Sequence, residues 1–512
     1  MQKITMEGDV SMRPQRYAYK KDCCVEGYLT VYLTLIMTVM LSLYLALIEG
    51  ARSNAVRLES ECVADIALNS VFAEYHQELY RQYNLFAIDT SYGTFRSGSK
   101  HLEEHLKDYL DKNFSMDDIF LQQIFYKDFL ALSTDNVDVT RALILSDYNG
   151  AVFRAAAVEA IKDDVGIGLL EQLNRWTQTV SDNGLLERDI AAEKDETDRE
   201  LESYDGRVIQ VAEDDEETKE IDEEEWVVVD INNPTDGLEQ IRRRGILDAV
   251  IGPVQELPAK TIDTDNLIQS RMELNRVSQG NYALDELSKG KELEERFFFQ
   301  EYLLKYMGRY GCTEEENALL YQIEYLLQGE ESDIANLRNT ANALCAIREV
   351  ANVIYIYSDE VKCAEAEVLG AVLAAICHMP ELSSLFKHTI LLGWAYAESL
   401  YDVKTLLAGG RIPLLKDDAS WHYDLSSALR LDSVVTDETQ GLSYADYLRI
   451  LMSFEDIDTL TLRAMNMVEA DIRLTAGNQY FRLDACYQSI EVSIKTQSSY
   501  GYSCEMTGRK KY

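Results

Sequence analysis

The chain has 512 residues, 46% of them hydrophobic, and a formal net charge of −40 at pH 7. This length and apolar share predict two to four structural units with sizeable cores. The charge excludes nucleic acid as a partner, because phosphates would be repelled, and it argues against binding to an anionic lipid surface. Only six prolines interrupt the chain, which favours long helices.

An uncharged apolar run covers Tyr28–Ile48, YLTVYLTLIMTVMLSLYLALI, and contains neither proline nor glycine. As a helix it spans about 30 Å, the thickness of the hydrocarbon core of a bilayer. A cleaved signal peptide usually has a shorter apolar run followed by an A-x-A-like site, which is missing here. A buried core helix fits runs of about 10–14 residues better. The run therefore predicts a transmembrane helix over 27–49, and the lack of a comparable window elsewhere predicts a single-pass protein.

Small residues recur at every fourth position of this run. A four-residue step of small side chains lets membrane helices approach closely, so it predicts a packing stripe and a lateral oligomer. The alternative is that the hydroxyl groups only bond to the backbone of their own helix. The stripe consists of Thr30, Thr34, Thr38, Ser42, Ala46 and Gly50.

The flanks of the run set the orientation that we expect. Basic residues are more numerous before the run than after it, which favours a cytoplasmic N-terminus for the tail 1–26 and an extracytoplasmic location for the bulk of the chain. The residues counted are Arg13, Arg16, Lys20 and Lys21 before the run, and Arg52 and Arg57 after it.

After the anchor, the helical pattern continues without a break over Ala51–Tyr83 as an amphipathic stem. The sequence NLFAIDTSYG predicts a short strand and a turn, and Lys100–Asn113 predicts a charged helix. Two strand-like runs, QIFYKDFLAL and VDVTRALILS, lie within Gln123–Ser146. We therefore expect residues 50–147 to form the stem helix and a small α+β region.

Tyr148–Asp205 again has a helical pattern and predicts a charged, solvated arm over 148–205. Ten acidic residues and one lysine follow between Glu213 and Glu225, which is typical of a disordered loop, and no EF-hand spacing accompanies them. This acidic loop opens a mixed segment, 206–292, in which WVVVDINNPTD predicts a strand meeting a turn.

Residues 293–512 predict a mostly helical domain that ends in a β-hairpin. Helical patterns cover Leu293–Arg430, with a stop at Gly409 and Gly410, and one further helix is expected over Tyr444–Leu474. The alternating end, YFRLDACYQSIEVSIKTQSSYGYSCEM, predicts the hairpin. The fold class is therefore α+β, dominated by helix.

The motif HLEEH, His101–His105, matches an inverted zinc-protease pattern in which Glu104 would be the general base. Its surroundings are those of an exposed charged helix, so we expect no metal site there. We expect Arg242–Arg244 to pair with the acidic excess of the chain, and Glu398 to pair with backbone or with Lys404. No phosphate-binding loop, dinucleotide fingerprint or nucleophile elbow is present, so we expect no catalytic residue, no cofactor and no enzymatic activity. A disulfide between Cys486 and Cys504 is left open.

Four segments carry a family resemblance: GYLTVYLTLIMTVMLSLYLALIEGARSNA, the stem end LYRQYNLFAID, QIEYLLQGEESDIANL, and GWAYAESLYDVKTLLAGGRIPLLK. Together they resemble an uncharacterised membrane-protein family of Gram-positive, clostridia-like bacteria that accompanies Tad/Flp pilus machinery and TadE/TadG-like pseudopilins. The N-terminal architecture resembles these pseudopilins, with one departure. Prepilin peptidase substrates have Glu at the fifth position after the cleaved Gly, whereas Tyr32 stands at the fifth position after Gly27.

These observations lead to three hypotheses. The first is a membrane-anchored structural or assembly component of the cell envelope, in the cell membrane, which the resemblance makes a minor pseudopilin-like part of a Tad/Flp-type pilus or secretion system. Its partners would be the membrane and other envelope or pilus-assembly proteins. The second is a membrane-tethered extracellular binding or sensing domain unrelated to pili. The third is a membrane-bound hydrolase that uses HLEEH.

Overall fold

The computed structural model describes residues 22–115, 130–211, 225–274, 292–430 and 440–512. Residues 1–21 of the expected cytoplasmic tail, most of the acidic loop and most of the run QIFYKDFLAL lie outside these residues, and the rest of the expected tail is the start of a helix. Contacts divide the chain into two units, each built from distant segments. The first unit combines the chain up to Leu68 with Leu106–Asp138 and Ser493–Gly508, and the second combines Asn69–His105, Val139–Val492 and Arg509–Tyr512.

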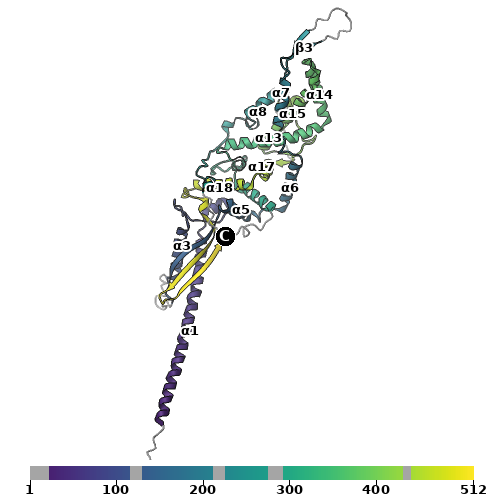
Figure 1. Cartoon of the computed structure of the whole chain (residues 1–512). Coiled ribbons are helices and arrows are strands. Elements are labelled where there is room, and N and C mark those ends of the chain that lie inside the picture. Colours follow the sequence, from purple (N-terminus) through teal and green to yellow (C-terminus); the bar gives the residue numbers. More distant parts are fainter. Residues whose placement is uncertain (1–21, 116–129, 212–224, 275–291, 431–439) are drawn as a thin grey trace, which may run out of the picture. The chain divides into compact units, whose positions relative to one another are not determined.

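Helices dominate the chain and strands are few, which confirms the expected helix-dominated α+β class (Figure 1). The N-terminal half of the chain contains α1 Asp22–Phe72, α2 Gln77–Tyr83, β1 Ile88–Asp89, α3 Ser99–Phe114, β2 Leu132–Ile144, α5 Asp147–Ile161, α6 Ile167–Asp182, α7 Ile190–Glu202, β3 Val208–Val211, β4 Glu225–Val228, α8 Asp236–Arg244, α9 Leu247–Val250, the 3-10 turn η1 Val254–Glu256 and α10 Ile268–Leu274. The C-terminal half contains α11 Glu292–Tyr306, α12 Gln322–Gln328, α13 Asp333–Ser358, α14 Glu360–Ile376, η3 Pro380–Leu382, α15 Ser383–Leu407, β5 Arg411–Ile412, α16 Leu425–Arg430, β6 Leu442–Ser443, α17 Tyr444–Phe454, α18 Ile457–Leu474, η4 Leu483–Ala485, β7 Cys486–Ser498 and β8 Ser503–Lys511.

In the first unit, α1 presents one face to the folded segments. Val56, Ser60, Val63 and Ala67 on this face are buried, and their spacing of three or four residues is that of one side of a helix. Buried apolar side chains from other elements of the unit pack there too, among them Leu106 and Leu110 of α3, Leu132 and Val137 of β2, and Ile494 of β7. The stem of the expected anchor is therefore amphipathic, as predicted.

The largest sheet has β7 at its centre. β1 and β2 pair with β7 on either side, and β8 also pairs with β7. β7 and β8 form the C-terminal hairpin that the alternating sequence predicts. Two small antiparallel pairs, β3 with β4 and β5 with β6, complete the described strands.

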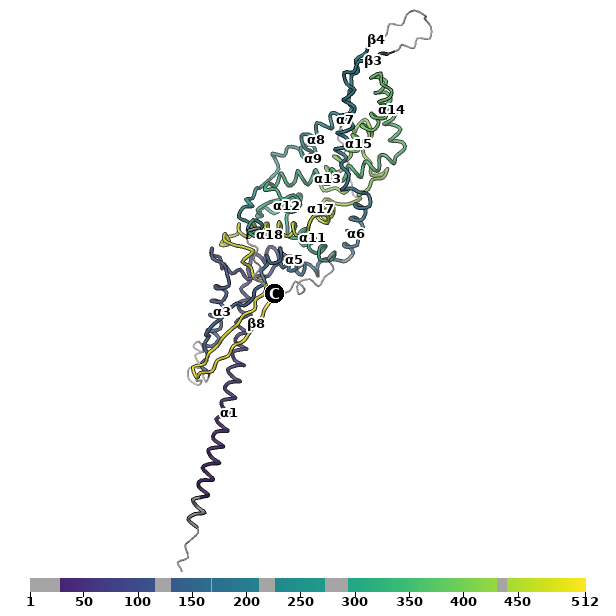
Figure 2. Tube along the Cα trace, in the orientation of Figure 1, coloured from purple at the N-terminus to yellow at the C-terminus, as the bar shows by residue number. Residues whose placement is uncertain are grey.

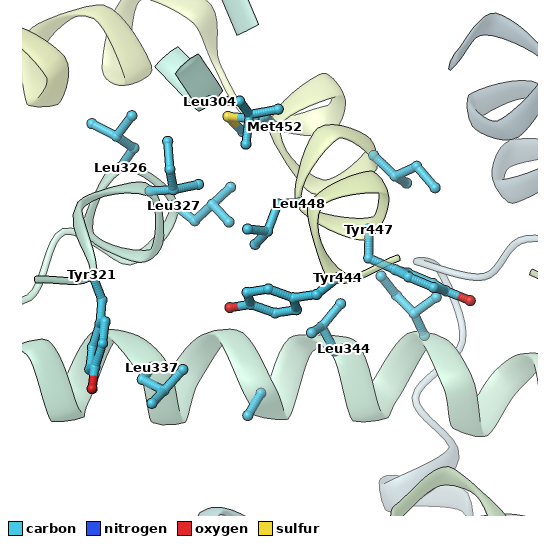
Figure 3. Packing of buried hydrophobic residues seen from close by; sticks show 14 of the residues in the cluster. Leu304, Tyr321, Leu326, Leu327, Leu337, Leu344, Tyr444, Tyr447, Leu448 and Met452 are labelled. Carbon is cyan, nitrogen blue, oxygen red and sulfur yellow. The ribbon is translucent and has the colours of Figure 1, made fainter. Parts of the chain in front are cut away.

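The core of the second unit is built on helix packing. α15 packs against both α13 and α14, and α12 packs against α13 (Figure 2). Leu337 and Leu344 of α13 meet Leu326 of α12 and Leu448 of α17 in one apolar layer (Figure 3). α15 ends at Leu407, just before Gly409 with φ 92°, so the predicted helix stop is confirmed.

Two expected helices are interrupted. The stem does not continue to Tyr83: α1 ends at Phe72, and α2 begins after His76, whose ring accepts the backbone N–H of Leu79. Likewise Tyr444–Leu474 is two helices, because Asp456 leaves helical geometry and caps α18 through the N–H of Thr459. In both places a side-chain cap satisfies donors at the start of a new helix, although the residues also fit a helical period.

The expected charged arm is helical over α5, α6 and α7, but it is not wholly solvated. Val152 and Phe153 of α5 belong to the main core, and Lys194 and Asp198 of α7 are buried as an ion pair. Its charges therefore serve packing as well as solvation.

Candidate functional site

The first candidate site is the apolar half of α1, the one helix of the described residues that is long and apolar enough to cross a membrane. Every residue from Tyr28 to Gly50 is exposed, and the large apolar side chains range from 39% exposed at Ile36 to 80% at Tyr28. Water-exposed apolar area of this extent is unfavourable, at about 25 cal/mol per Å². Insertion into an apolar environment would remove this cost, so the exposed run is a candidate membrane anchor.

The predicted stripe lies on this exposed half. Thr34, Thr38 and Ser42 each donate their hydroxyl to a backbone carbonyl of α1, at 2.9, 2.6 and 2.7 Å. Nothing lies within 4 Å of the position that a Cβ on Gly50 would take. The hydroxyls are satisfied within the helix, so any lateral association has to come from close packing.

His101 and His105 of HLEEH lie on α3, and each has a partner of its own. The Nδ1 of His101 lies 3.2 Å from the carbonyl oxygen of Thr90. The Nδ1 of His105 lies 3.1 Å from Oε2 of Glu74, and its ring stacks on Tyr92 with 3.9 Å between centroids. Within the described residues, no group of three or more His, Cys, Asp or Glu side chains is arranged to hold a metal ion.

The basic run lies at the end of α8. Arg242 pairs with Glu349 at 2.5 Å and with Glu239 at 3.4 Å, and its guanidinium lies over the ring of Tyr396. Burial lowers the pKa of Arg242, but the two carboxylates outweigh it and the net shift is upward. Arg242 thus pairs with the acidic excess, as predicted, whereas Arg243 and Arg244 are exposed.

Glu398 is fully buried on α15, and its partner is not Lys404. Its carboxylate accepts Nζ of Lys416 at 2.6 Å and the backbone N–H groups of His422 and Tyr423. Lys404 is exposed because six residues turn a helix by about 600°, which places it about 240° around the axis from Glu398. Of the two expected alternatives, a neighbouring backbone or Lys404, the structure shows backbone partners, which come from residues 24 and 25 positions away, and it does not show Lys404 as a partner.

Lys416 joins Glu398 to a buried ionic network that the sequence did not reveal. Its Nζ lies 2.7 Å from Oδ1 of Asp402, whose Oδ2 accepts Nε of Arg348 at 2.9 Å. All four side chains are completely buried, and they carry two positive and two negative charges. Burial raises the pKa of Asp402, but Lys416 and Arg348 outweigh it and hold the pKa below its usual range.

The network ties three parts of the second unit together. Arg348 on α13 also donates to the carbonyls of Pro413 and Leu414, at 2.9 and 2.7 Å. A sequence signal existed: Arg348 and Asn352 interrupt an otherwise apolar face of α13. Every charge in the network has a partner and is shielded from water, which fits a structural role better than a catalytic one.

A cleft of about 540 Å³ opens in the second unit, beside a carboxyl with an unusual pKa. The residues that line the cleft are Arg81, Gln82, Tyr83, Lys305, Tyr306, Glu314, Glu316, Asn317, Leu474 and Thr475. The two basic side chains that line the cleft already have acidic partners: Arg81 pairs with Glu78 at 2.7 Å, and Lys305 pairs with Asp164 at 2.6 Å.

Asp471 lies behind the wall of this cleft. Tyr83 donates its hydroxyl to Asp471, and Gln322 donates to Oδ2 of Asp471 at 2.6 Å. The backbone N–H of Ala318 donates to Oδ1 at 2.5 Å. Burial raises the pKa of Asp471 to about 6, against these hydrogen bonds. The carboxyl can therefore change its protonation state near neutral pH.

Among the cysteines whose side chains are described, Cys486 and Cys504 were the candidate disulfide pair. Cys486 and Cys504 are both free, so the disulfide that the sequence left open does not form. Burial raises the pKa of both thiols, which keeps them protonated and unreactive.

A family model matches residues 224–498, more than half of the chain, and its description is a family of unknown function, DUF5702. Comparisons with curated proteins and with solved structures find no significant match. The matched region begins at β4 and includes the buried ionic network and Asp471, whereas the apolar half of α1 precedes it.

Proposed function

We propose that this chain, a member of the DUF5702 family of unknown function, is a single-pass membrane-anchored structural component of the cell envelope. One observation carries the proposal: the exposed apolar run and the buried stem face belong to one unbroken 51-residue helix. A continuous helix transmits position and force, whereas a flexible linker would not. Such a helix suits a part that must be held rigidly at a membrane.

The interior of the second unit supports a scaffold more than an enzyme. Four buried charges in this interior, Arg348, Asp402, Lys416 and Glu398, are mutually paired, and none of them lines the cleft beside Asp471. Buried charges that are paired with one another help to specify one arrangement of the fold, and they do not create a reactive group. On this proposal the bulk of the chain is extracytoplasmic and the anchor joins other membrane helices through its stripe.

The finer assignment is a minor pseudopilin-like part of a Tad/Flp-type pilus or secretion system. It is supported by the resemblance of the N-terminal segments and by the architecture of anchor plus continuous stem. The cleft beside Asp471 favours the alternative, a membrane-tethered binding or sensing domain, because a sensing domain needs such a cavity for its ligand.

Anchoring is tested by alkaline carbonate extraction of membranes from cells that express the full chain. We expect the chain to stay in the pellet. The variant Leu35→Arg/Leu41→Arg should move to the supernatant, because each arginine at the centre of a span costs about 2.5–3.5 kcal/mol. The matched control Leu58→Arg, at an exposed position beyond the run, should stay in the pellet. Recovery of the unaltered chain in the supernatant would contradict the proposal.

Assembly is tested by crosslinking intact cells and purifying the tagged full chain in mild detergent. Copurification of pilus or secretion components, lost in the Leu35→Arg/Leu41→Arg variant, would support the first assignment. Copurification of no envelope protein, with specific retention of a small molecule by the full chain, would favour the sensing domain. Protease added to protoplasts should degrade the chain beyond residue 50, and protection of that part would reverse the proposed topology.

A further inference from the structure

The tip of the C-terminal hairpin lies against α1 at the point where the apolar run ends. Both belong to the first unit. The run ends at Ile48, and the carboxylate of Glu49, the next residue, lies near enough to the hydroxyl of Tyr502 to raise its pKa. The guanidinium of Arg52 lies 5.2 Å from the ring centre of Tyr500. Two tyrosines from the far end of the sequence thus meet the first charged residues after the candidate span.

The direction of the hairpin along α1 is fixed by further contacts. Ser60 and Thr496 share a buried hydrogen bond of 2.8 Å. Thr496 precedes the tip on β7, and Ser60 lies on α1 farther from the apolar run than Arg52. The hairpin therefore runs along α1 with its tip directed toward the apolar run.

The depth of the tip follows from helix geometry. Arg52 is four residues beyond Ile48, about 6 Å along the axis. The headgroup layer on each side of a bilayer is about 5–8 Å thick, the difference between the whole bilayer and its hydrocarbon core. If α1 crosses the membrane along its apolar run, Arg52 and the two tyrosines lie at headgroup depth.

The chemistry of the tip suits this depth. Tyrosine is enriched at membrane interfaces because its ring is apolar and its hydroxyl is polar. Tyr500 remains 54% exposed although Arg52 covers part of its ring. The neighbours Ser499 and Gly501 are small, so they do not hinder the approach of lipid headgroups.

We propose that the hairpin tip, Ser499–Tyr502, is a second membrane contact that inserts Tyr500 into the headgroup layer beside α1. The partner is a lipid surface, and a zwitterionic one, because the net charge of −40 repels anionic lipid. This inference rests on the proposed membrane anchoring. It makes the hairpin a brace that holds the first unit at a defined angle to the bilayer.

Photocrosslinking to lipid tests the contact in the full chain. The variant Tyr500→p-benzoylphenylalanine is reconstituted into phosphatidylcholine vesicles and irradiated, and lipid adducts are measured by mass spectrometry. The same substitution at Tyr44, inside the apolar run, reports whether α1 is inserted. The same substitution at Thr507, exposed on β8 about 13 Å beyond Ser503, is the matched control on the hairpin.

We expect strong adducts at position 44 and adducts at position 500 several-fold above those at position 507. If position 44 forms adducts but position 500 forms no more than position 507, the tip contact is overturned and the anchor is left intact. Absence of adducts at position 44 would overturn the anchoring proposal itself, and the tip contact with it. Equal adducts at positions 500 and 507 would also overturn the tip contact, since they would show unspecific labelling of the hairpin.

Discussion

Arg348 donates from Nε to Oδ2 of Asp402 at 2.9 Å, and neither side chain has any exposed surface. The pair joins α13 to α15, and Lys416 extends it to the segment after β5. Charges removed from water in this way are stabilised only while every partner is present. We therefore expect the stability of the second unit to be most sensitive to substitutions in this network.

Replacing Arg348 with methionine keeps the length of the side chain and removes its charge. We expect Arg348→Met to lower the free energy of unfolding by about 3–5 kcal/mol, the usual cost of removing one partner of a buried ion pair. Part of this loss arises because the carbonyls of Pro413 and Leu414 would lose Arg348 as their hydrogen-bond donor. The measurement is urea denaturation followed by circular dichroism.

The control is Arg338→Met on the same helix, where the arginine is exposed and a change of less than about 0.5 kcal/mol is expected. The double variant Arg348→Met/Asp402→Leu should lose less than the sum of the two single variants, because it leaves no unpaired carboxylate. Additive losses would argue that the two residues do not act as a pair.

Asp471 makes the stability of the protein depend on pH. Burial raises its pKa from 3.8 to about 6, so the folded protein binds this proton more tightly than the unfolded chain. Its contribution therefore favours folding below about pH 4 and is lost as the pH rises through 6. Two pKa units correspond to about 3 kcal/mol. The stability difference between the unaltered chain and Asp471→Asn should shift by about this amount between pH 4 and 7.

Asp456 supplies a control of opposite sign. Its carboxylate caps α18 through the N–H of Thr459, and that hydrogen bond is the main reason that its pKa is lowered. The stability it contributes is present above the unfolded pKa and is lost as the pH falls through the lower, folded value. Asp456→Asn should therefore be destabilised at neutral pH and converge with the unaltered chain in acid. Parallel pH profiles for the two variants would refute at least one of the two assignments, namely the one whose sign the profiles do not follow.

The sequence was sufficient to predict the structure wherever a local pattern of residues decides it. The apolar run, the charged helix α3, the stop after Leu407 and the alternating hairpin were all predicted from periodicity and turn residues. The breaks at His76 and Asp456 were missed because their neighbours keep a helical period, and only the capping geometry distinguishes a new helix from a continued one.

Tertiary partners were the least predictable feature. Glu398 was expected to pair with backbone or with Lys404, but its lysine partner, Lys416, reaches it from the segment after β5. Arg348 was not singled out from the sequence, and nothing local identifies Asp402, 54 residues away, as its partner. Asp471 is an ordinary acid in a charged helix until the fold encloses it with Tyr83 and Gln322.

The motif HLEEH should not bind zinc. The full chain, purified in detergent and analysed by atomic emission, should contain well under one zinc ion per molecule. Zinc content should not change in His101→Ala/His105→Ala. The double variant should lose about 1 kcal/mol of stability, because His105 gives up its stacking on Tyr92 and its contact with Glu74. The exposed Glu104→Ala is the control for stability. Stoichiometric zinc that disappears in the double variant would move the protein to the hydrolase class.

The anchor should associate laterally through its stripe. Consecutive stripe residues are rotated by about 40° along α1, because four residues turn a helix by about 400°. A period above 3.6 favours a right-handed crossing of two such helices, as in other small-residue interfaces. The hydroxyls of Thr34, Thr38 and Ser42 already bond to their own backbone, so packing rather than hydrogen bonding has to supply the affinity.

Thr34→Leu/Thr38→Leu keeps the helix apolar and prevents the close approach. We expect crosslinking between cysteines placed along α1 to fall several-fold in this variant, measured in native membranes. The matched control is Tyr32→Leu/Ile36→Leu, about 160° from the stripe residues on the helix surface, which should crosslink normally. Both variants should insert into membranes equally well by carbonate extraction. If crosslinking is unchanged in Thr34→Leu/Thr38→Leu, the stripe does not mediate association, and its hydroxyls are simply tolerated through their backbone bonds.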